Sequence, residues 1–201
     1  MLFVLSDKEY DEMEIEAFRS NAKDRCYHCK KNIMTGIWNI ARKYNLQYVI
    51  EGSNLDDEGD YRPGHRAIQE LQIQSPLRSC GFTKENIRQL ARILEIQLWN
   101  KPSFACLASR FVYGEDITKE KLRMVENGEK LLMYMGFTQF RVRVHGTLAR
   151  IEVLPEDFER LMKQENREKI LIKFKEFGFS YVTMDLKGYR TGSMNEILKE
   201  I

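Results

Sequence analysis

The stretch Lys101-Pro-Ser-Phe-Ala-Cys-Leu-Ala-Ser-Arg-Phe-Val-Tyr-Gly114 divides the chain into two parts with different patterns of apolar residues. It reads as an apolar loop that carries a thiol, Cys106, four residues before Arg110. Strand-like and helix-like segments alternate before this loop, whereas a helix, two strands, a helix and a strand are expected after it. We therefore predict one domain over residues 1–105 and a second over residues 106–201.

The first part is predicted to be α/β, a partial Rossmann-like parallel sheet covered by helices. Apolar residues at helical spacing between Lys30 and Tyr44 predict an amphipathic helix, with Cys26-Tyr-His-Cys29 at its N-terminus. A second helix is expected over Ile87–Leu94, capped by Thr83, and a strand over Gln47–Ile50. The apolar run at residues 1–5 predicts a strand, followed by an acidic connecting loop to residue 20.

The second part is predicted to be a small α+β domain with an antiparallel sheet. A helix is expected over Glu120–Met135, a hairpin over residues 140–153, and a helical stretch over residues 156–177, broken near residues 164–166, before a strand at Tyr181–Leu186. In the first hairpin strand, Phe140, Val142 and Val144 alternate with Arg141, Arg143 and His145. Alternation of this kind predicts a half-buried strand with a basic outer face.

Composition limits the classes of partner. A net charge of +2 over 201 residues gives no reason to expect broad attraction to nucleic acid or to a membrane surface. No apolar run approaches the ~20 residues that span a bilayer, and residues 1–5 are too short and uncharged for a signal peptide. A cytoplasmic protein without a membrane partner is therefore expected, and four cysteines are too few for a disulfide framework.

The cysteines suggest metal or redox chemistry. The CxxC motif is compatible with an iron–sulfur cluster, a zinc site with His28 as a possible fourth ligand, or a redox pair. Together with Cys106 it supplies three thiolates, and a [4Fe–4S] cluster held by three protein sulfurs keeps one iron open. A cysteine in the apolar setting of Cys106 is more often a core thiol, and Cys80 is interpreted as structural.

Two groups of charged residues are candidates for binding. Asn54, Asp56, Asp57 and Asp60 follow the predicted Gln47–Ile50 strand, where they could hold Mg²⁺ or form an ordinary solvated turn. Guanidinium groups bind phosphate or carboxylate bidentately, although alternating arginines also commonly solvate the outer face of a sheet. The candidate anion-binding residues are Arg110, Arg141, Arg143 and Arg190.

Several ordered motifs resemble the LarE family of ATP-dependent sulfur transferases, within the PP-loop ATP pyrophosphatase superfamily. The similarity runs from about residue 20 to the C-terminus. The motifs are Asp24–Lys30, Glu51–Asp57, Asp60–Gly64, Lys101–Arg110, Arg141–Arg143, Ala149–Glu152 and Gly188–Asn195.

The resemblance implies that ATP, with Mg²⁺, adenylates a carboxylate of pyridinium-3,5-biscarboxylic acid mononucleotide, and that sulfur then displaces AMP. It implies a nucleotide-like small-molecule substrate and a homo-oligomer. Cys26, Cys29 and Cys106 match the branch that holds a [4Fe–4S] cluster carrying sulfide. Another branch sacrifices a cysteine at the position of Ala105, so sacrifice of Cys106 is the alternative sulfur source.

The remaining roles follow from the same resemblance. Ser109 and Arg110 match a substrate-contacting pair, Glu129 an acidic position near the site, and Arg141 and Arg143 the arginines for the substrate phosphate, which Arg190 could join. Asn54, Asp56 and Asp57 are assigned to the nucleotide and Mg²⁺.

The sequence departs from the family at its start, because the SGGxDS loop that holds pyrophosphate is missing. A truncated or split enzyme, or a catalytically incomplete iron–sulfur or substrate-binding fragment, is one alternative. Thiolation of tRNA is a second, and the balanced charge argues against it.

Overall fold

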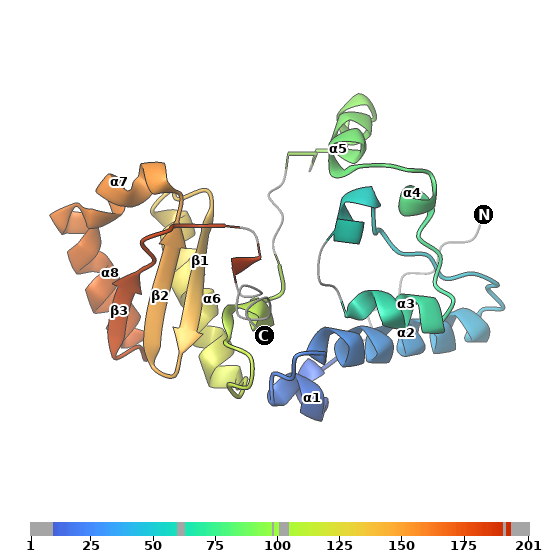
Figure 1. Cartoon of the computed structure of the whole chain (residues 1–201), viewed down its shortest axis with the longest axis horizontal. Helices are drawn as coiled ribbons and strands as arrows, with labels where there is room; N and C mark the ends of the chain where they lie inside the picture. The colour runs from blue at the N-terminus through green and yellow to red at the C-terminus, as the bar shows by residue number, and fades with distance from the viewer. Residues whose placement is uncertain (1–9, 60–62, 98, 101–104, 191, 194–201) are drawn as a thin grey trace. The chain divides into compact units, whose positions relative to one another are not determined.

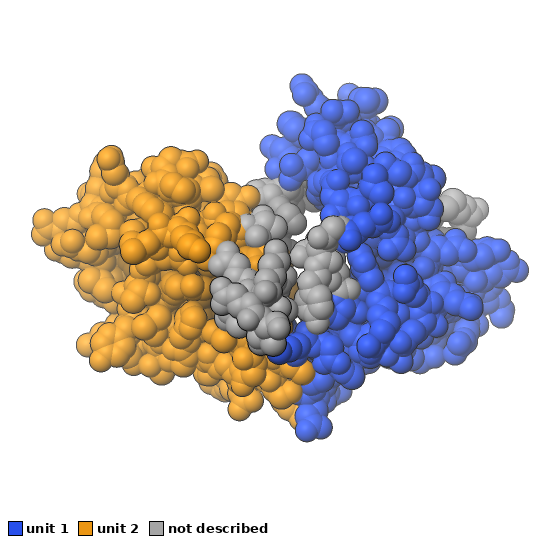
Figure 2. Space-filling view, viewed as in Figure 1, with its two compact units in different colours: residues 1–18, 23–104 blue, residues 19–22, 105–201 orange. Residues whose placement is uncertain are grey.

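The computed structural model describes residues 10–59, 63–97, 99–100, 105–190 and 192–193, and the strand predicted at residues 1–5 lies outside these ranges. The chain divides into two compact units, coloured separately in Figure 2. Unit 1 comprises residues 1–18 and 23–104, and unit 2 comprises residues 19–22 and 105–201. Mixed helix and sheet is confirmed as the fold class.

Unit 1 is mainly helical (Figure 1). Its elements are η1 (Glu12–Glu14), α1 (Glu16–Arg19, whose last residue belongs to unit 2), α2 (Arg25–Lys43), η2 (Leu55–Gly59), α3 (Gly64–Glu70), α4 (Pro76–Ser79) and α5 (Lys84–Ile93). The helical turns η1 and α1 replace the simple loop expected before residue 20. Asp11 begins η1 by accepting a hydrogen bond from the backbone N–H of Met13.

A small apolar core joins α2 and α3. Ala41 and Ile68 are buried with Val49 and Ile73, and the indole N–H of Trp38 donates to the carbonyl of Leu71 at 2.8 Å. The run predicted as a strand at residues 47–50 contributes a parallel bridge between Ile50 and Gln74. Two backbone hydrogen bonds flank this bridge, so the described part of unit 1 contains parallel pairing.

The helix α5 forms where its sequence predicts, behind a capping box made by Thr83 and Asn86. Among the described residues, however, no core covers its apolar stripe. Leu90 is 40% exposed and Leu94 61% exposed. Apolar spacing therefore predicted the helix correctly but not the burial of its face.

Unit 2 is a mixed three-stranded sheet backed by helices (Figure 1). Its elements are η3 (Leu107–Arg110), α6 (Lys119–Tyr134), β1 (Phe140–His145), β2 (Leu148–Val153), η4 (Pro155–Asp157), α7 (Phe158–Met162), α8 (Gln164–Glu176) and β3 (Tyr181–Met184). Gly136, at φ +84°, ends α6 in a conformation that favours glycine. The prediction of an antiparallel sheet was wrong for β3, which pairs parallel to β2.

The core of unit 2 lies between the sheet and the helices α6 and α8. Val142 and Ile151 are buried on the sheet, and Leu132 and Phe174 are buried on the helices. A Cβ added at Gly128 would lie 3.0 Å from the Phe174 ring, which shows how closely α6 approaches α8. This packing fixes one face of the sheet and leaves the alternate side chains of each strand on the other.

Candidate functional site

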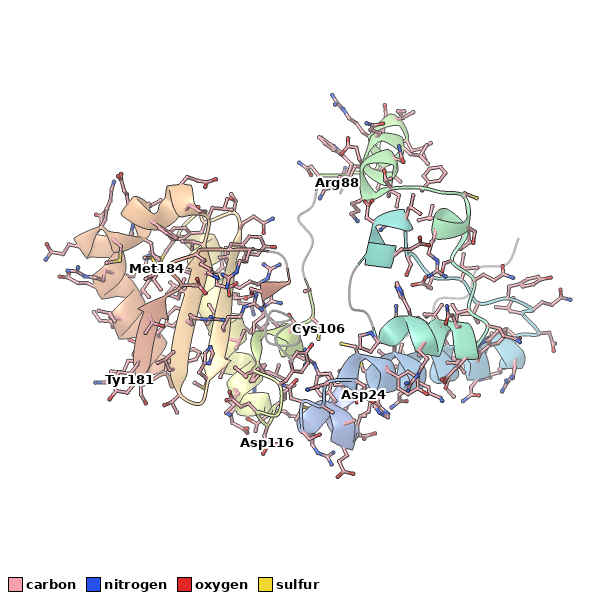
Figure 3. All side chains as sticks on the ribbon, in the orientation of Figure 1. Asp24, Arg88, Cys106, Asp116, Tyr181 and Met184 are labelled. Carbon is pink, nitrogen blue, oxygen red and sulfur yellow. The ribbon has the colours of Figure 1, made fainter. Side chains whose placement is uncertain are left out.

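The loop that carries Cys106 is described from Ala105 onward, and Lys101–Phe104 lies outside the described residues. Cys106 is exposed and precedes η3, as labelled in Figure 3. A single parallel bridge between Phe111 and Val144 lays the end of this loop beside β1. The loop therefore reaches the sheet at the strand that carries Arg141 and Arg143.

Arg110 is a buried anchor of the loop, only 1% exposed. Its guanidinium makes a bidentate pair with Glu129 on α6, with N–O distances of 2.7 and 2.9 Å. Its third nitrogen donates to the carbonyls of Ala105 and Cys106 and to the Ser109 hydroxyl. Glu129 also accepts the backbone N–H of Val142 at 3.1 Å, which ties helix, strand and loop together.

Arg143 forms a second buried pair. Its Nε and Nη2 atoms donate to Glu152 on β2 at 3.0 and 2.9 Å. Nη1 donates to the carbonyl of Ser109 at 2.9 Å, and Nη2 also donates to the Ser193 hydroxyl at 2.6 Å. Arg143 is 5% exposed and Glu152 is fully buried.

Three further arginines extend this network. Arg150 lies between Glu152, at 3.5 Å, and Asp185, at 3.1 Å, and Asp185 also pairs with Arg190 at 3.3 Å. The Arg141 guanidinium lies over the Tyr189 ring, 5.0 Å from its centroid. Burial lowers the pKa of Arg141, and the charges of Arg110 and Arg143 lower it further, while Tyr189 and Glu129 oppose this shift.

Five arginines and three carboxylates among the described residues make up this network. The arginines are Arg110, Arg141, Arg143, Arg150 and Arg190, and the carboxylates are Glu129, Glu152 and Asp185. Guanidinium groups clustered in this way are suited to binding phosphate or carboxylate. Unit 2 therefore brings together Ser109 and every arginine predicted to bind an anion.

The alternative in which alternating arginines only solvate the outer face of β1 was wrong for Arg141 and Arg143. Arg141 is 6% exposed and Arg143 5%, and Arg143 donates hydrogen bonds to the Ser109 loop and to Ser193 on that face. The sequence analysis did not assign Glu152 or Asp185 to the site. The sequence did contain a signal for Glu152, because it lies opposite Arg141 in the register of β1 and β2 and so shares one face of the hairpin with the arginines.

The CxxC motif occupies the first turns of α2, as predicted. Cys26 is exposed and Cys29 partly buried, and none of the four cysteines, all of which are described, forms a disulfide. Residues three apart on a helix lie on the same side of it, so both thiols share a face. The Nε2 atom of His28 lies 3.1 Å from Asp24, its neighbour one turn earlier.

Tyr27, inside the motif, anchors this turn to α3. Its hydroxyl donates to Glu70 at 2.7 Å and accepts from Lys31 at 2.7 Å. The guanidinium of Arg66 lies 3.6 Å from the centroid of the Tyr27 ring. Tyr27, one of the two residues between the cysteines, therefore helps to fix the start of the helix.

In the acidic loop after residue 50, the carboxylates of Asp56 and Asp57 accept hydrogen bonds from backbone N–H groups. Asp57 accepts the backbone N–H of Asn54 at 2.9 Å, and Asp56 accepts that of Lys84, at the start of α5, at 2.7 Å. Within the described ranges, no three His, Cys, Asp or Glu side chains converge as metal ligands. Asp60 lies outside those ranges.

Glu51 is the most enclosed carboxylate of this loop. Burial raises its pKa, but hydrogen bonds from Ser75 and Ser53 and the charge of Lys30 outweigh burial, so the pKa of Glu51 is lowered. The hydroxyls of Ser75 and Ser53 both donate to this carboxylate. Glu51 therefore links the loop to the segment before α4.

Similarity to individual proteins, and not to a family model, places the chain in a family. No family model matches it. It is 40% identical to the uncharacterized protein slr1717 of Synechocystis over 94% of this chain and 70% of that protein. It is 34% identical to the uncharacterized protein MJ0830 of Methanocaldococcus jannaschii over 89% of this chain and 69% of that protein.

A third relative carries a functional name. The pyridinium-3,5-bisthiocarboxylic acid mononucleotide synthase of Lactiplantibacillus plantarum is 36% identical over 94% of this chain and 67% of its own length. In the described ranges, no helix has the length and apolar character needed to cross a bilayer. The chain belongs to the LarE family of sulfur-transfer enzymes.

Proposed function

We propose that the chain takes part in converting a carboxylate of pyridinium-3,5-biscarboxylic acid mononucleotide to a thiocarboxylate. The arginine network of unit 2, which holds the Cys106 loop through Arg110 and Arg143, carries this proposal. A phosphorylated dicarboxylate is the kind of anion that guanidinium groups bind well. The name of the Lactiplantibacillus plantarum relative describes the bisthiocarboxylic product.

The proposed reaction has two steps. A substrate carboxylate oxygen attacks the α-phosphorus of ATP, which releases pyrophosphate and gives an acyl adenylate. Sulfide then attacks the activated carbonyl carbon, the C–O bond to AMP breaks, and a thiocarboxylate remains. Adenylation matters because it turns a poor leaving group into a good one.

The contacts of unit 2 support the proposed roles of its residues. Ser109, Arg110 and Glu129 are proposed to hold the loop against the substrate, since Arg110 binds three acceptors in that loop and Glu129 fixes Arg110. Arg141, Arg143 and Arg190 are proposed to meet the substrate phosphate. Asn54, Asp56 and Asp57 remain the proposed nucleotide and Mg²⁺ residues, in a Rossmann-like arrangement with which the parallel bridge at Ile50 is compatible.

Cys26, Cys29 and Cys106 are proposed to hold a [4Fe–4S] cluster, which when bound would supply the transferable sulfide. The donor chemistry fits, because two thiols share the first turns of α2, where the helix N-terminus favours thiolates, and Cys106 is exposed. The alternative is sacrifice of Cys106. In that case the Cβ–Sγ bond breaks after transfer, the Hα proton leaves, and dehydroalanine remains.

The test measures iron and acid-labile sulfide per chain after anaerobic reconstitution, followed by mass spectrometry of the product with ATP and substrate. About four irons per chain, lost in Cys106→Ala but kept in Cys80→Ala, are expected for a three-thiolate cluster. Cys80 is the matched control because it is also exposed. Loss of the Cys106 sulfur from the chain after turnover would favour the sacrificial route, and absence of thiocarboxylate would refute the proposed function.

We also propose that the enzyme acts in the cytoplasm as a homo-oligomer. The assignment of residues 1–105 to nucleotide chemistry and of residues 106–201 to the substrate remains part of this proposal. Sedimentation of the purified chain tests the oligomeric state. ATP binding, measured for Asp56→Ala and Asp57→Ala beside the parent chain, tests the assignment of residues 1–105 to nucleotide chemistry.

A further inference from the structure

The loop that carries Cys106 is held through its own backbone by two buried guanidinium groups. Arg110 binds the carbonyls of Ala105 and Cys106 at 3.0 and 3.1 Å, and Arg143 binds the carbonyl of Ser109 at 2.9 Å. Both arginines are at most 5% exposed. Their positions therefore determine how the loop, and with it the exposed thiol, is presented.

The two arginines are themselves held differently. Arg110 depends on Glu129. Arg143 depends on Glu152 and on Ser193, whose hydroxyl accepts from Nη2 at 2.6 Å and donates to Glu152 at 3.1 Å. Each nitrogen of Arg143 thus has an acceptor within unit 2, and one of these acceptors is the loop carbonyl.

Geometry explains why this arrangement is restrictive. A bidentate carboxylate fixes the plane of a guanidinium group, because two parallel hydrogen bonds leave little rotation. Glu152 binds the Nε–Nη2 edge of Arg143 and directs Nη1 at Ser109. Ser193, in the segment after β3, bonds both Arg143 and Glu152 through its hydroxyl. This serine of the C-terminal motif is therefore connected to the loop through Arg143.

We propose that Glu152 and Ser193 are positioning residues that hold Arg143 against the Ser109 carbonyl and thereby set the orientation and reactivity of the Cys106 thiol. This inference rests on the proposed function for its catalytic meaning. Glu152 and Ser193 act through Arg143 and need no contact with the substrate. It also gives the serine of the C-terminal motif a task distinct from phosphate binding.

The test compares Ser193→Ala with Ser193→Thr, which keeps the hydroxyl, and with Ser180→Ala as a matched control. Ser180 is an exposed serine of the same unit, outside the network. The first readout is the time profile of Cys106 alkylation by iodoacetamide at one fixed pH in the cluster-free chain, followed peptide by peptide in a mass spectrometer, with Cys80 as internal reference. The second readout is kcat and KM for sulfur transfer.

In Ser193→Ala we expect the Cys106 alkylation profile to change while Cys80 is unaffected, and kcat to fall roughly tenfold with KM within about twofold. Ser193→Thr should restore both, and Ser180→Ala should leave both unchanged. The alkylation measurement needs no turnover, so it tests the positioning role even if the proposed sulfur-transfer reaction proves wrong.

Unchanged Cys106 alkylation in a natively folded Ser193→Ala chain overturns the proposal, whatever the activity. Glu152→Gln is the second variant, and it should change the same profile in the same direction. If Glu152→Gln fails to fold, Ser193→Ala decides, since it removes one hydroxyl and no charge.

Discussion

The buried Arg110–Glu129 pair provides the sharpest prediction about stability. Glu129 is 8% exposed, pairs bidentately with an arginine that is 1% exposed, and accepts the N–H of Val142. Glu129→Ala removes the carboxylate and leaves the guanidinium buried without its counter-charge. Breaking a buried pair in this way costs about 3–5 kcal/mol.

The expected cost is large for a unit of this size. For a domain near 100 residues, each kcal/mol lowers Tm by roughly 4–8 °C, so Glu129→Ala should lower the Tm of unit 2 by about 12–40 °C. Glu126→Ala is the matched control on the same helix. Glu126 is 47% exposed and pairs with Lys130, which is 52% exposed, so its loss should cost under about 1 kcal/mol.

The assay is urea and thermal unfolding followed by far-UV circular dichroism, with both variants measured beside the parent chain. If Glu129→Ala proved no more destabilising than Glu126→Ala, the buried pair would contribute nothing and the description of the loop anchor would be wrong. A double variant, Arg110→Met with Glu129→Leu, should recover part of the loss, because replacing both partners removes the stranded charge.

Three further predictions concern separate parts of the chain. The lowered pKa of Glu51 means that its stabilisation is present above the unfolded pKa and lost as pH falls through the folded pKa, so Glu51→Gln should flatten acid unfolding below about pH 4.5. The pKa of His145, at the exposed end of β1, is lowered by partial burial of its ring and by the charge of Arg150, so some stability should be lost as pH falls below about 6.5, and His145→Asn should reduce that slope in urea titrations. Gly128→Ala would place a Cβ 3.0 Å from Phe174, and although alanine favours helices by about 1 kcal/mol, overpacking should cost about 1–3 kcal/mol and lower Tm. An increase in Tm would show that the ring can shift.

Local patterns predicted most of the elements. Helical spacing located α2, α5 and α6, and alternation located the β1–β2 hairpin. The break predicted near residues 164–166 occurs at Lys163, between α7 and α8. These features depend on neighbours a few residues apart, so a single sequence contains their signal.

The direction of β3 could not be predicted from strand patterns alone. The connection between β2 and β3 contains α7 and α8, which return the chain so that β3 enters parallel to β2. The attachment of residues 19–22 to unit 2 was also missed. It depends on Asn21, whose side chain donates to the carbonyl of Val112, and on the N–H of Gly114, which donates back to its carbonyl.

The candidate site shows the same division. The sequence determined which residue types were present: the Cys106 loop, the CxxC motif and the alternating arginines that identify the family. Only the tertiary structure decided that Arg141 and Arg143 are buried and that Glu152 and Ser193 hold Arg143 on the loop. Alternation fixes the face on which a side chain lies, but what covers that face depends on segments tens of residues away, and these meet only when the sheet and its flanking loops pack together.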